Sequence, residues 1–255
     1  MTWGRPSSRG MQSTGQPPGM PMDRPRSILF DAVGTIIYPD PDVLAVYHRL
    51  GQQHGSQLAK DVVESRFKRL RRTVFQSELT GDSTQQDLSR FEFPSSQQGE
   101  KKLWQDLVQH LFSDISETEP LFDQLWQHFA DPDHWRVYQD VPECWASLQQ
   151  AGIAIGVASN FDNRLEPILA GLGLNDLASQ VFHSAQLGFR KPDLRFYRAI
   201  EATWPFSSIL MVGDDYLNDY LAPRLCGWQS LQLVRQKERR TTNSINSLEN
   251  LVERF

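Results

Sequence analysis

The sequence predicts a doubly wound, Rossmann-like parallel α/β sheet with an all-helical segment inserted after its first strand. Short apolar runs that end in polar residues occur at three places in the chain, which is typical of buried strands in a parallel sheet. From about residue 138 onward these runs alternate with helical stripes, as they do when helices cover both faces of a sheet. Residues 41–133, in contrast, carry helical stripes and no strand signal.

The first strand is predicted at Ser27–Phe30. This run is short and mostly apolar, and it is bounded by Pro25 on one side and by the turn residues Gly34-Thr35 on the other. Residues 1–26 are rich in Gly, Pro, Ser, Arg and Met and lack both apolar periodicity and the apolar centre of a signal peptide. We therefore expect a flexible tail before the first strand.

Four amphipathic helices are predicted in the insert, which we place at residues 41–137. Each has apolar residues three and four positions apart, and their ranges are Asp42–His54, Lys60–Ser77, Lys101–Phe112 and Glu119–Phe129. Between the second and third helices, the stretch Thr80–Gly99 is polar and rich in Gly, Ser and Gln, so it is predicted to be a loop.

The α/β core is predicted from residues 27–40 together with residues 138–235. Its remaining strands are predicted at Ile153–Ala158, Val181-Phe182, Ser208–Val212 and Ser230–Val234. Its helices are predicted at Glu143–Ala151, Arg164–Leu172 and Leu194–Thr203. Residues 236–255 are expected to form a C-terminal tail or helix.

Composition and charge argue against several classes of protein. The formal net charge of -5 and the pI near 5.7 do not fit the basic face that nucleic acid requires. The two cysteines form no CxxC pair, so we expect a reducing, cytoplasmic compartment. No stretch approaches the roughly 18–20 apolar residues of a membrane span. We therefore expect neither a nucleic acid nor a membrane as partner, and the sequence carries no signal for an oligomeric state.

Polar residues follow three of the predicted strands: Asp31, then Ser159-Asn160, then Asp214-Asp215. Ligands of open parallel sheets bind at the carboxyl ends of the strands, so these residues are expected to converge. Asp31 and Asp214 have the oxygen ligands that Mg²⁺ prefers, and we expect them within about 8 Å, close enough to share one ion. Ser159 could donate a hydrogen bond to a phosphoryl oxygen, and Lys191 could balance the negative charge. Such an Asp also serves as a helix N-cap, which is the plainer alternative.

Four segments resemble, in order, the motifs of the haloacid dehalogenase superfamily. Ile28–Thr35 is similar to its first motif, a strand followed by DxxGT, and Val157–Asn160 is similar to its second. Lys191–Asp193 resembles the third motif, and Met211–Asp215 followed by Asp219 resembles the acidic fourth. The resemblance covers residues 27 to 235 and implies the core fold of that superfamily, with the insert as a helical cap of the first type.

The resemblance implies a Mg²⁺-dependent phosphatase that acts on a small phosphorylated substrate through an aspartyl-phosphate. The implied catalytic residues are Asp31, Ser159 and Lys191, and the implied substrate-binding residues are Thr35 and Asn160. The implied metal ligands are Asp31, the backbone carbonyl of Val33, Asp214 and Asp219. Three longer segments resemble one poorly characterised branch of haloacid dehalogenase-like hydrolases, with largely unassigned substrates: Phe30–Thr35, Ser159–Leu165 and Asp214–Tyr220.

Val33 departs from the pattern of the superfamily's phosphatases, which usually carry a second Asp at this position. That Asp protonates the leaving group and later activates water, and valine cannot move a proton. General acid–base catalysis is worth about 10²–10⁴ in rate, or roughly 3–5 kcal/mol of barrier. The sequence therefore leaves open a phosphatase of modest rate, one whose substrates need little protonation, one with a donor elsewhere, or a catalytically weak protein that binds a phosphate ligand or a partner.

Two further functions remain open. In dehalogenases of the superfamily the nucleophilic Asp displaces halide from carbon, and Tyr stands at the Val33 position. These relatives need no metal, so the acidic residues Asp214, Asp215 and Asp219 argue against that function. Phosphonate hydrolases have a small residue at this position and a cap lysine that forms an imine, and nothing in the sequence marks Lys60 or Lys68 for that role.

The remaining polar and aromatic residues are interpreted as structural. The six histidines show no HExxH or paired ligand spacing. Four tryptophans are expected in the core or between the domains, namely Trp104, Trp126, Trp135 and Trp145. Asp162 and Arg164, just past Ser159, are expected either to pair with each other or to contact the substrate.

Overall fold

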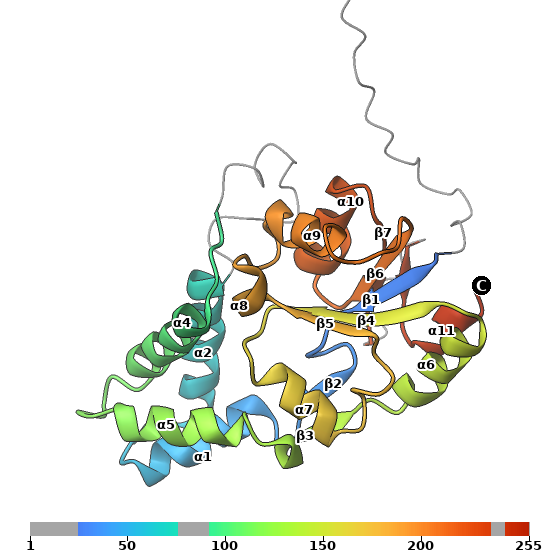
Figure 1. Cartoon of the computed structure of the whole chain (residues 1–255). Helices are drawn as coiled ribbons and strands as arrows, with labels where there is room; N and C mark the ends of the chain where they lie inside the picture. Colours follow the sequence, from blue (N-terminus) through green and yellow to red (C-terminus); the bar gives the residue numbers. More distant parts are fainter. Residues whose placement is uncertain (1–24, 76–91, 236–242, 255) are drawn as a thin grey trace, which may run out of the picture.

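The computed structural model describes residues 25–75, 92–235 and 243–254 (Figure 1). The tail expected at residues 1–26 lies almost wholly outside the described residues, as do residues 80–91 of the predicted loop. A six-stranded parallel sheet lies between two layers of helices, and a group of further helices lies to one side of it (Figure 1). Within the described part of the chain, no helix is both long and apolar enough to cross a bilayer.

The six strands are parallel to their neighbours and lie in the order β5-β4-β1-β6-β7-β8. Their bounds are β1 Ser27–Phe30, β4 Ala154–Ser159, β5 Gln180–His183, β6 Ile209–Gly213, β7 Gln229–Leu233 and β8 Ser244–Ile245. Strand β1 is central, and its Phe30 is in register with Val157 of β4 and with Val212 of β6. This register brings the carboxyl ends of the three strands together at one edge of the sheet.

The side chains of β1 alternate between two hydrophobic cores. Ile28 and Phe30 pack in the core that is covered by α6 (Val141–Gln150), α7 (Leu165–Gly171) and α11 (Glu249–Val252). Leu29 packs on the opposite face, under α8 (Ser184–Leu187), α9 (Leu194–Glu201) and α10 (Ala222–Leu225). Because strand side chains alternate, an apolar strand such as β1 needs a helical layer on each face. The predicted doubly wound fold is confirmed.

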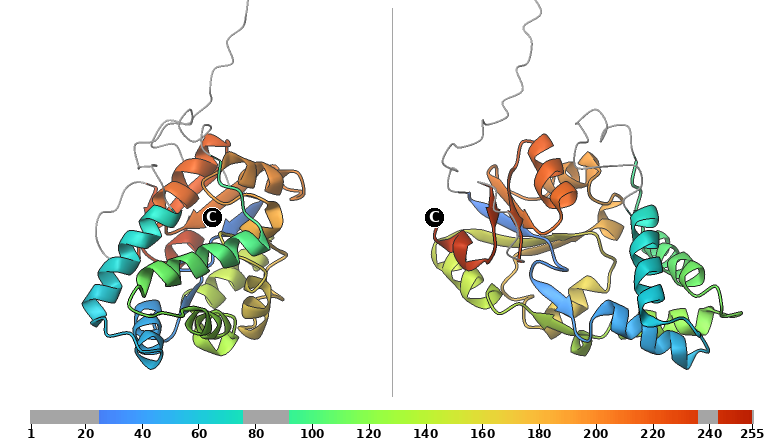
Figure 2. Two further views of the ribbon diagram at one scale, coloured as in Figure 1. Left: turned by 90° about the vertical axis from the view of Figure 1, so that its left-hand side faces the viewer. Right: turned by 180° about the vertical axis from the view of Figure 1, so that it is seen from behind.

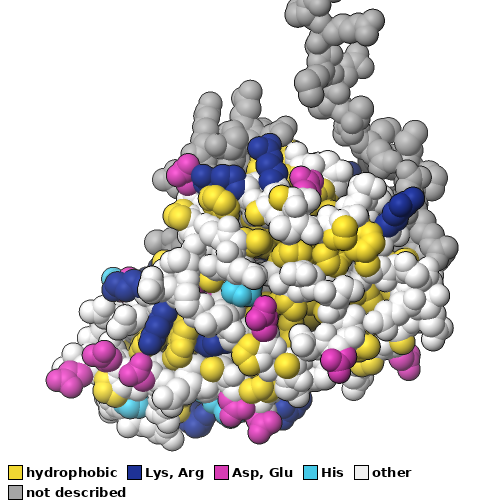
Figure 3. Space-filling view, viewed as in Figure 1, with side chains coloured by type: hydrophobic (Ala, Val, Ile, Leu, Met, Phe, Trp, Pro, Cys, Tyr) yellow, Lys and Arg dark blue, Asp and Glu magenta, His cyan; other side chains and the backbone are white. Residues whose placement is uncertain are grey.

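The helices of the insert lie together to one side of the sheet (Figure 2). They have a hydrophobic core of their own, distinct from the two cores of the sheet. Its helices are α1 Val43–Gln53, α2 Lys60–Phe75, α4 Gln97–Leu111 and α5 Glu119–His128, close to the predicted ranges. Helix α4 begins earlier than predicted, because the Ser96 hydroxyl caps it by accepting the N–H of Gly99 at 3.0 Å. On the face shown in Figure 3, acidic and basic side chains lie interspersed over the insert.

Several short elements lie outside the predicted strands and helices. Strands β2 (Ile37–Pro39) and β3 (Trp135–Val137) pair antiparallel, and the 3₁₀ turn η1 (Pro132–His134) precedes β3. Beyond the predicted end of the core at residue 235, β8 adds the last strand of the sheet and α11 packs against α6. These segments are too short to show apolar periodicity, and tertiary contacts define them.

Candidate active site

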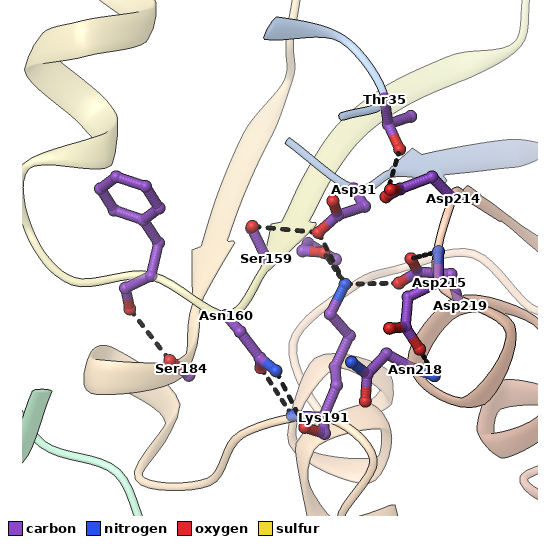
Figure 4. Close-up of polar contacts among 12 residues, drawn as sticks. Asp31, Thr35, Ser159, Asn160, Ser184, Lys191, Asp214, Asp215, Asn218 and Asp219 are labelled. Carbon is purple, nitrogen blue, oxygen red and sulfur yellow. Dashed lines mark hydrogen bonds and ion pairs between the residues drawn. The ribbon is translucent and has the colours of Figure 1, made fainter. Parts of the chain in front are cut away.

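The carboxyl ends of β1, β4 and β6 bring the predicted site residues together at one edge of the sheet (Figure 4). Asp31 follows β1, Ser159 is the last residue of β4, and Asp214 follows β6. The parallel register of the three strands is what makes these positions neighbours, although they are far apart in the sequence.

Asp31 lies at the centre of the site and is 8% exposed. Its Oδ1 atom accepts a hydrogen bond from Ser159 Oγ at 3.0 Å and forms an ion pair with Lys191 Nζ at 2.8 Å. Its backbone N–H donates to the carbonyl of Val212 at 2.9 Å, which extends the sheet by one residue. A buried carboxylate requires such partners. Asp31 therefore contacts both of the other residues predicted to be catalytic.

Lys191 is held at both ends of its side chain. Asn160 clamps the backbone, donating from Nδ2 to the Lys191 carbonyl at 2.8 Å and accepting the Lys191 N–H at 2.7 Å. The ammonium donates to Asp31, to Asp219 at 2.5 Å and to the carbonyl of Ala158 at 2.9 Å. Burial disfavours the charged ammonium, but Asp219 and Asp31 outweigh it and raise the pKa of Lys191. The Asn160 amide thus positions Lys191, a contact that the sequence did not predict.

Asp219 reaches the site from η2, a π-helix at Tyr216–Leu221. Asp215 caps the start of this helix with its carboxylate, and its N–H donates to Asp219 Oδ2 at 3.1 Å. The strand before the helix must end in a glycine, because a Cβ on Gly213 would lie 2.3 Å from the Asp219 carboxyl. π-Helical turns are rare and often occur at functional sites. Here the π-helical turn carries Asp219, whose carboxylate accepts a hydrogen bond from the Lys191 ammonium.

Asp214 lies against the loop that follows Asp31. Gly34 has a φ of +92°, and a Cβ at this position would lie 2.7 Å from Asp214 Oδ2. Glycine can adopt this positive φ, and its lack of a Cβ leaves room for the Asp214 carboxylate. The hydroxyl of Thr35, a fully buried residue, donates to Asp214 Oδ1 at 3.4 Å. Arg235 also holds this loop, because its Nη2 atom donates a hydrogen bond to the Thr35 carbonyl at 2.6 Å.

Asp31, Asp214 and Asp219 each offer a carboxylate oxygen, and these oxygens lie within 4.8 Å of one another. The predicted proximity of Asp31 and Asp214 is confirmed. Asp214 is solvent-accessible, but the atoms around its carboxyl partly desolvate it, and Asp31 and Asp215 add negative charge. Together these effects raise its pKa to about 6. Three carboxylates facing one ammonium, that of Lys191, form an oxygen donor set that suits a hard divalent cation such as Mg²⁺.

Val33 sits in a tight loop that returns toward the sheet. The backbone N–H groups of Ile36 and Ile37 both donate to the carbonyl of Ala32, and Val33 forms an isolated bridge with Ile37. The half-buried side chain of Val33 packs against the larger hydrophobic core. The position at which the resemblance to the superfamily's phosphatases implies an acid is therefore part of the apolar packing in this chain.

Asp162 and Arg164 pair with each other. Arg164 donates from Nε to Asp162 Oδ1 at 2.8 Å and from Nη2 to Asp162 Oδ2 at 2.7 Å. The guanidinium also lies 3.3 Å from the ring centroid of Trp126, which belongs to the insert. Of the two expectations for this pair, mutual pairing is thus confirmed, and Arg164 also joins the core to the insert. Among the described residues, the cluster suited to a metal contains no histidine.

Comparison with known proteins gives a consistent family match. A profile of the haloacid dehalogenase-like hydrolase family matches residues 25–227. The haloacid dehalogenase-like hydrolase domain-containing protein 3 of Danio rerio is 32% identical over 223 residues, which cover 85% of this chain and 88% of that protein. The Homo sapiens protein of the same name is 33% identical over 141 residues, which cover 52% of this chain and 56% of that protein.

Solved structures share the fold at low sequence identity. The HAD-hydrolase YfnB from Bacillus subtilis, bound to magnesium, superposes with a TM-score of 0.72 at 18% identity and covers 91% of this chain and 98% of its own. A HAD phosphatase from Thermococcus onnurineus has a TM-score of 0.59 at 20% identity, with 89% and 96% covered. The L-2-haloacid dehalogenase from Xanthobacter autotrophicus has a TM-score of 0.64 at 14% identity, with 90% and 98% covered. At these identities the likeness is one of fold.

Proposed function

This chain belongs to the haloacid dehalogenase-like hydrolase family, and from that premise we propose that it is a Mg²⁺-dependent phosphatase for a small phosphorylated metabolite. The observation that carries the proposal is the contact of Asp31 with Ser159 and Lys191 beside two further carboxylates. A carboxylate nucleophile, a hydroxyl donor, a fixed ammonium and a divalent-cation donor set are the groups that phosphoryl transfer to an aspartate uses. The proposal includes the poorly characterised branch and the first-type cap that the sequence resembles.

In the proposed reaction Asp31 attacks phosphorus and the bond from phosphorus to the leaving oxygen breaks. Ser159 and Lys191 both hold Oδ1 of Asp31, so we assign the attack to Oδ2. The product is an aspartyl-phosphate, which water then cleaves to release inorganic phosphate and restore the carboxylate. Throughout, the Lys191 ammonium offsets the negative charge of the nucleophile and of the phosphoryl oxygens.

We assign Mg²⁺ to Asp31, Asp214, Asp219 and the backbone carbonyl of Val33. When bound, the ion neutralises phosphate charge so that a carboxylate can approach phosphorus. Support comes from the three carboxylate oxygens within 4.8 Å of one another. The pKa of Asp214 is raised first by desolvation and then by the negative charges of Asp31 and Asp215, which a bound cation would offset. The magnesium bound in the Bacillus subtilis structure is in keeping with this assignment.

We propose that residues 41–137 act as a cap that closes over the site and keeps water out during attack on phosphorus. The insert meets the core close to Ser159, where Gln97 Oε1 accepts the N–H of Asn163 at 3.0 Å and Trp126 stacks on Arg164. A cytoplasmic location is proposed as well. It is supported by the two cysteines, which are free thiols.

One observation favours a second candidate function. Val33, half-buried, packs against the apolar core at the position of the usual acid, which fits a catalytically weak protein that binds a phosphate ligand or a partner. A dehalogenase is less well supported, because it would make no use of the carboxylates of Asp214 and Asp219.

A panel of phosphate esters, assayed with and without Mg²⁺ alongside 2-haloacids and phosphonates, tests the proposal. Phosphate release that requires Mg²⁺ is the expected result. Binding of inorganic phosphate without turnover of any ester would support the second candidate. Halide release from a 2-haloacid in the presence of a chelator would overturn the phosphatase assignment.

A further inference from the structure

A buried charge, Glu100, joins the helical insert to the core beside the proposed active site. Glu100 lies in the first turn of α4 and is 2% exposed. No step of the proposed reaction uses it. Because glutamates are almost never fully buried unless they are paired, the partners of this one indicate its role.

Glu100 contacts both the insert and the core. Its Oε2 atom accepts a hydrogen bond from Arg190 Nη2 at 3.0 Å, in a pair whose side chains are 2% and 8% exposed. Its Oε1 atom accepts from Ser95 Oγ at 2.5 Å and from Ser184 Oγ at 3.3 Å. Ser95 precedes α4, whereas Arg190 and Ser184 belong to the core. One carboxylate thus connects the start of a cap helix to two separate core segments.

Both core contacts of Glu100 are connected to Lys191, one directly and one through Phe161 and Asn160. Arg190 is its covalent neighbour, and Asn160 clamps its backbone from the other side. The Ser184 hydroxyl shares its one proton between the Glu100 carboxylate and the carbonyl of Phe161, the residue after Asn160. Glu100 therefore contacts Arg190 directly, and through Ser184 it is connected to the segment of Phe161 and Asn160.

Backbone hydrogen bonds also join the two segments that carry the Glu100–Arg190 ion pair. The N–H of Ser95 donates to the carbonyl of Gly188, and the N–H of Arg190 donates to the carbonyl of Phe93, each at 2.9 Å. The short strip before α4 thus runs antiparallel to the segment before Lys191. A shift of α4 would move this segment with it.

We propose that Glu100 is a positioning residue that acts through Arg190 to place Lys191 against Asp31. The inference rests on the proposed function, because it assumes that Lys191 takes part in phosphate chemistry. Stability alone does not account for a charge at this place, since apolar residues of similar volume often hold a buried interface as well as an ion pair does. A directional hydrogen bond from a guanidinium to a carboxylate specifies where the two segments meet, and the placement of Lys191 depends on that position.

Substitution of Glu100 tests the proposal. Glu100→Gln keeps the shape and removes the charge, and Glu100→Asp keeps the charge on a shorter side chain. Leu107→Ala is the matched control, because Leu107 lies on the same helix, fully buried in the insert's own core. Each protein is assayed, at a temperature where circular dichroism shows it folded, for turnover of p-nitrophenyl phosphate with Mg²⁺ and for affinity for inorganic phosphate by calorimetry.

We expect Glu100→Gln to lower kcat by about 10–100-fold and to weaken phosphate binding about tenfold, as a misplaced group does. Glu100→Asp should recover part of both losses, whereas Leu107→Ala should lower the melting temperature with less than about a twofold change in either quantity. In a Lys191→Met background, Glu100→Gln should add no further loss of phosphate affinity, because the group it positions is gone.

The inference is overturned if the wild type turns over the ester while Glu100→Gln matches either the wild type or Leu107→Ala. If Glu100→Gln does not fold, Arg190→Lys decides, since it keeps the charge but loses the fork of donors. A kcat of Arg190→Lys below that of the wild type supports the inference, and a kcat equal to that of the wild type overturns it. A wild type that neither cleaves the ester nor binds phosphate contradicts the proposed function itself, and the positioning role with it.

Discussion

A substitution at Asp31 can remove the proposed nucleophile while the fold is kept. Asp31→Asn keeps nearly the same shape but replaces the carboxylate that we propose as nucleophile with an amide. We expect ester turnover to fall on the order of 10⁴–10⁶-fold, as it does when a nucleophile is removed. Phosphate release under saturating Mg²⁺, with circular dichroism as a check on folding, measures this. Asp106→Asn is the control, because this half-buried carboxylate of α4 pairs with Lys102 and lies outside the site. Wild-type turnover by Asp31→Asn would show that another group is the nucleophile.

Val33 sets the expected dependence on the leaving group. If the missing acid limits the rate, aryl and acyl phosphates, whose leaving groups depart without a proton, are cleaved faster than alkyl phosphates. Val33→Asp should then raise alkyl-phosphate turnover by up to about 10²–10⁴. Because Val33 packs against the core, the new carboxyl is expected to have a raised pKa, which suits a proton donor.

The Val33→Asp experiment compares rates across leaving groups of graded pKa. Val33→Asn is the matched control, since it places a polar group of the same size without a transferable proton. A flat dependence on leaving group in the wild type, with no gain in Val33→Asp, would mean that another group already supplies the proton.

At the scale of elements, His128 at the end of α5 stacks on His134 of η1, and we expect this contact to make stability depend on pH. The rings of His128 and His134 lie 3.6 Å apart between centroids. Burial, with the charges of His134 and Arg49, lowers the pKa of His128 to about 4. In the unfolded chain the pKa is near the ordinary value of about 6.5, so between pH 6.5 and 4 the unfolded state binds a proton that the folded state does not. The free energy of unfolding therefore falls as the pH drops through this range.

His128→Gln is expected to reduce that fall in stability by on the order of 1 kcal/mol, a value discounted for the partial exposure of the ring. Urea unfolding of wild type and variant at pH 7.5 and pH 4.5 measures the difference. His110→Gln, at an exposed position of α4, serves as the control. An unchanged difference in stability between the two pH values would rule out His128 as its source.

At the scale of the whole molecule, the proposed Mg²⁺ would connect segments that are distant in the sequence, because its assigned ligands include Asp31, Asp214 and Asp219. A ligand that binds only the folded state stabilises it, by about 2.7 kcal/mol at 100 times its Kd. For a chain of this length we expect Mg²⁺ at that excess to raise the melting temperature by about 5–10 °C, and a chelator to reverse the change.

Asp214→Asn tests whether this stabilisation arises at the proposed site. The variant should lose most of the Mg²⁺-dependent shift. Without Mg²⁺ it should melt above the wild type, because one of three neighbouring negative charges is gone. Differential scanning fluorimetry with and without Mg²⁺ measures both effects, and a full Mg²⁺ shift in Asp214→Asn would place the ion elsewhere.

The sequence by itself determined the fold class, the helices of the insert and the position of Asp31, Ser159 and Asp214 at one edge of the sheet. Apolar periodicity is a local property, and it shows directly in the order of residues which faces of a helix or strand are buried. The carboxyl ends of parallel strands must share an edge, so the polar residues that follow them meet whatever the details of packing.

Only the tertiary structure decided how the site is held. The Asn160 clamp on Lys191, the Glu100–Arg190 ion pair and the packing of Val33 each join segments that no local pattern connects. The π-helix that carries Asp219 and the strand β8 are too short to leave a periodic signal. Such contacts depend on where whole elements come to lie, because a side chain's partners across a sheet or between domains are set by three-dimensional packing rather than by spacing along the chain.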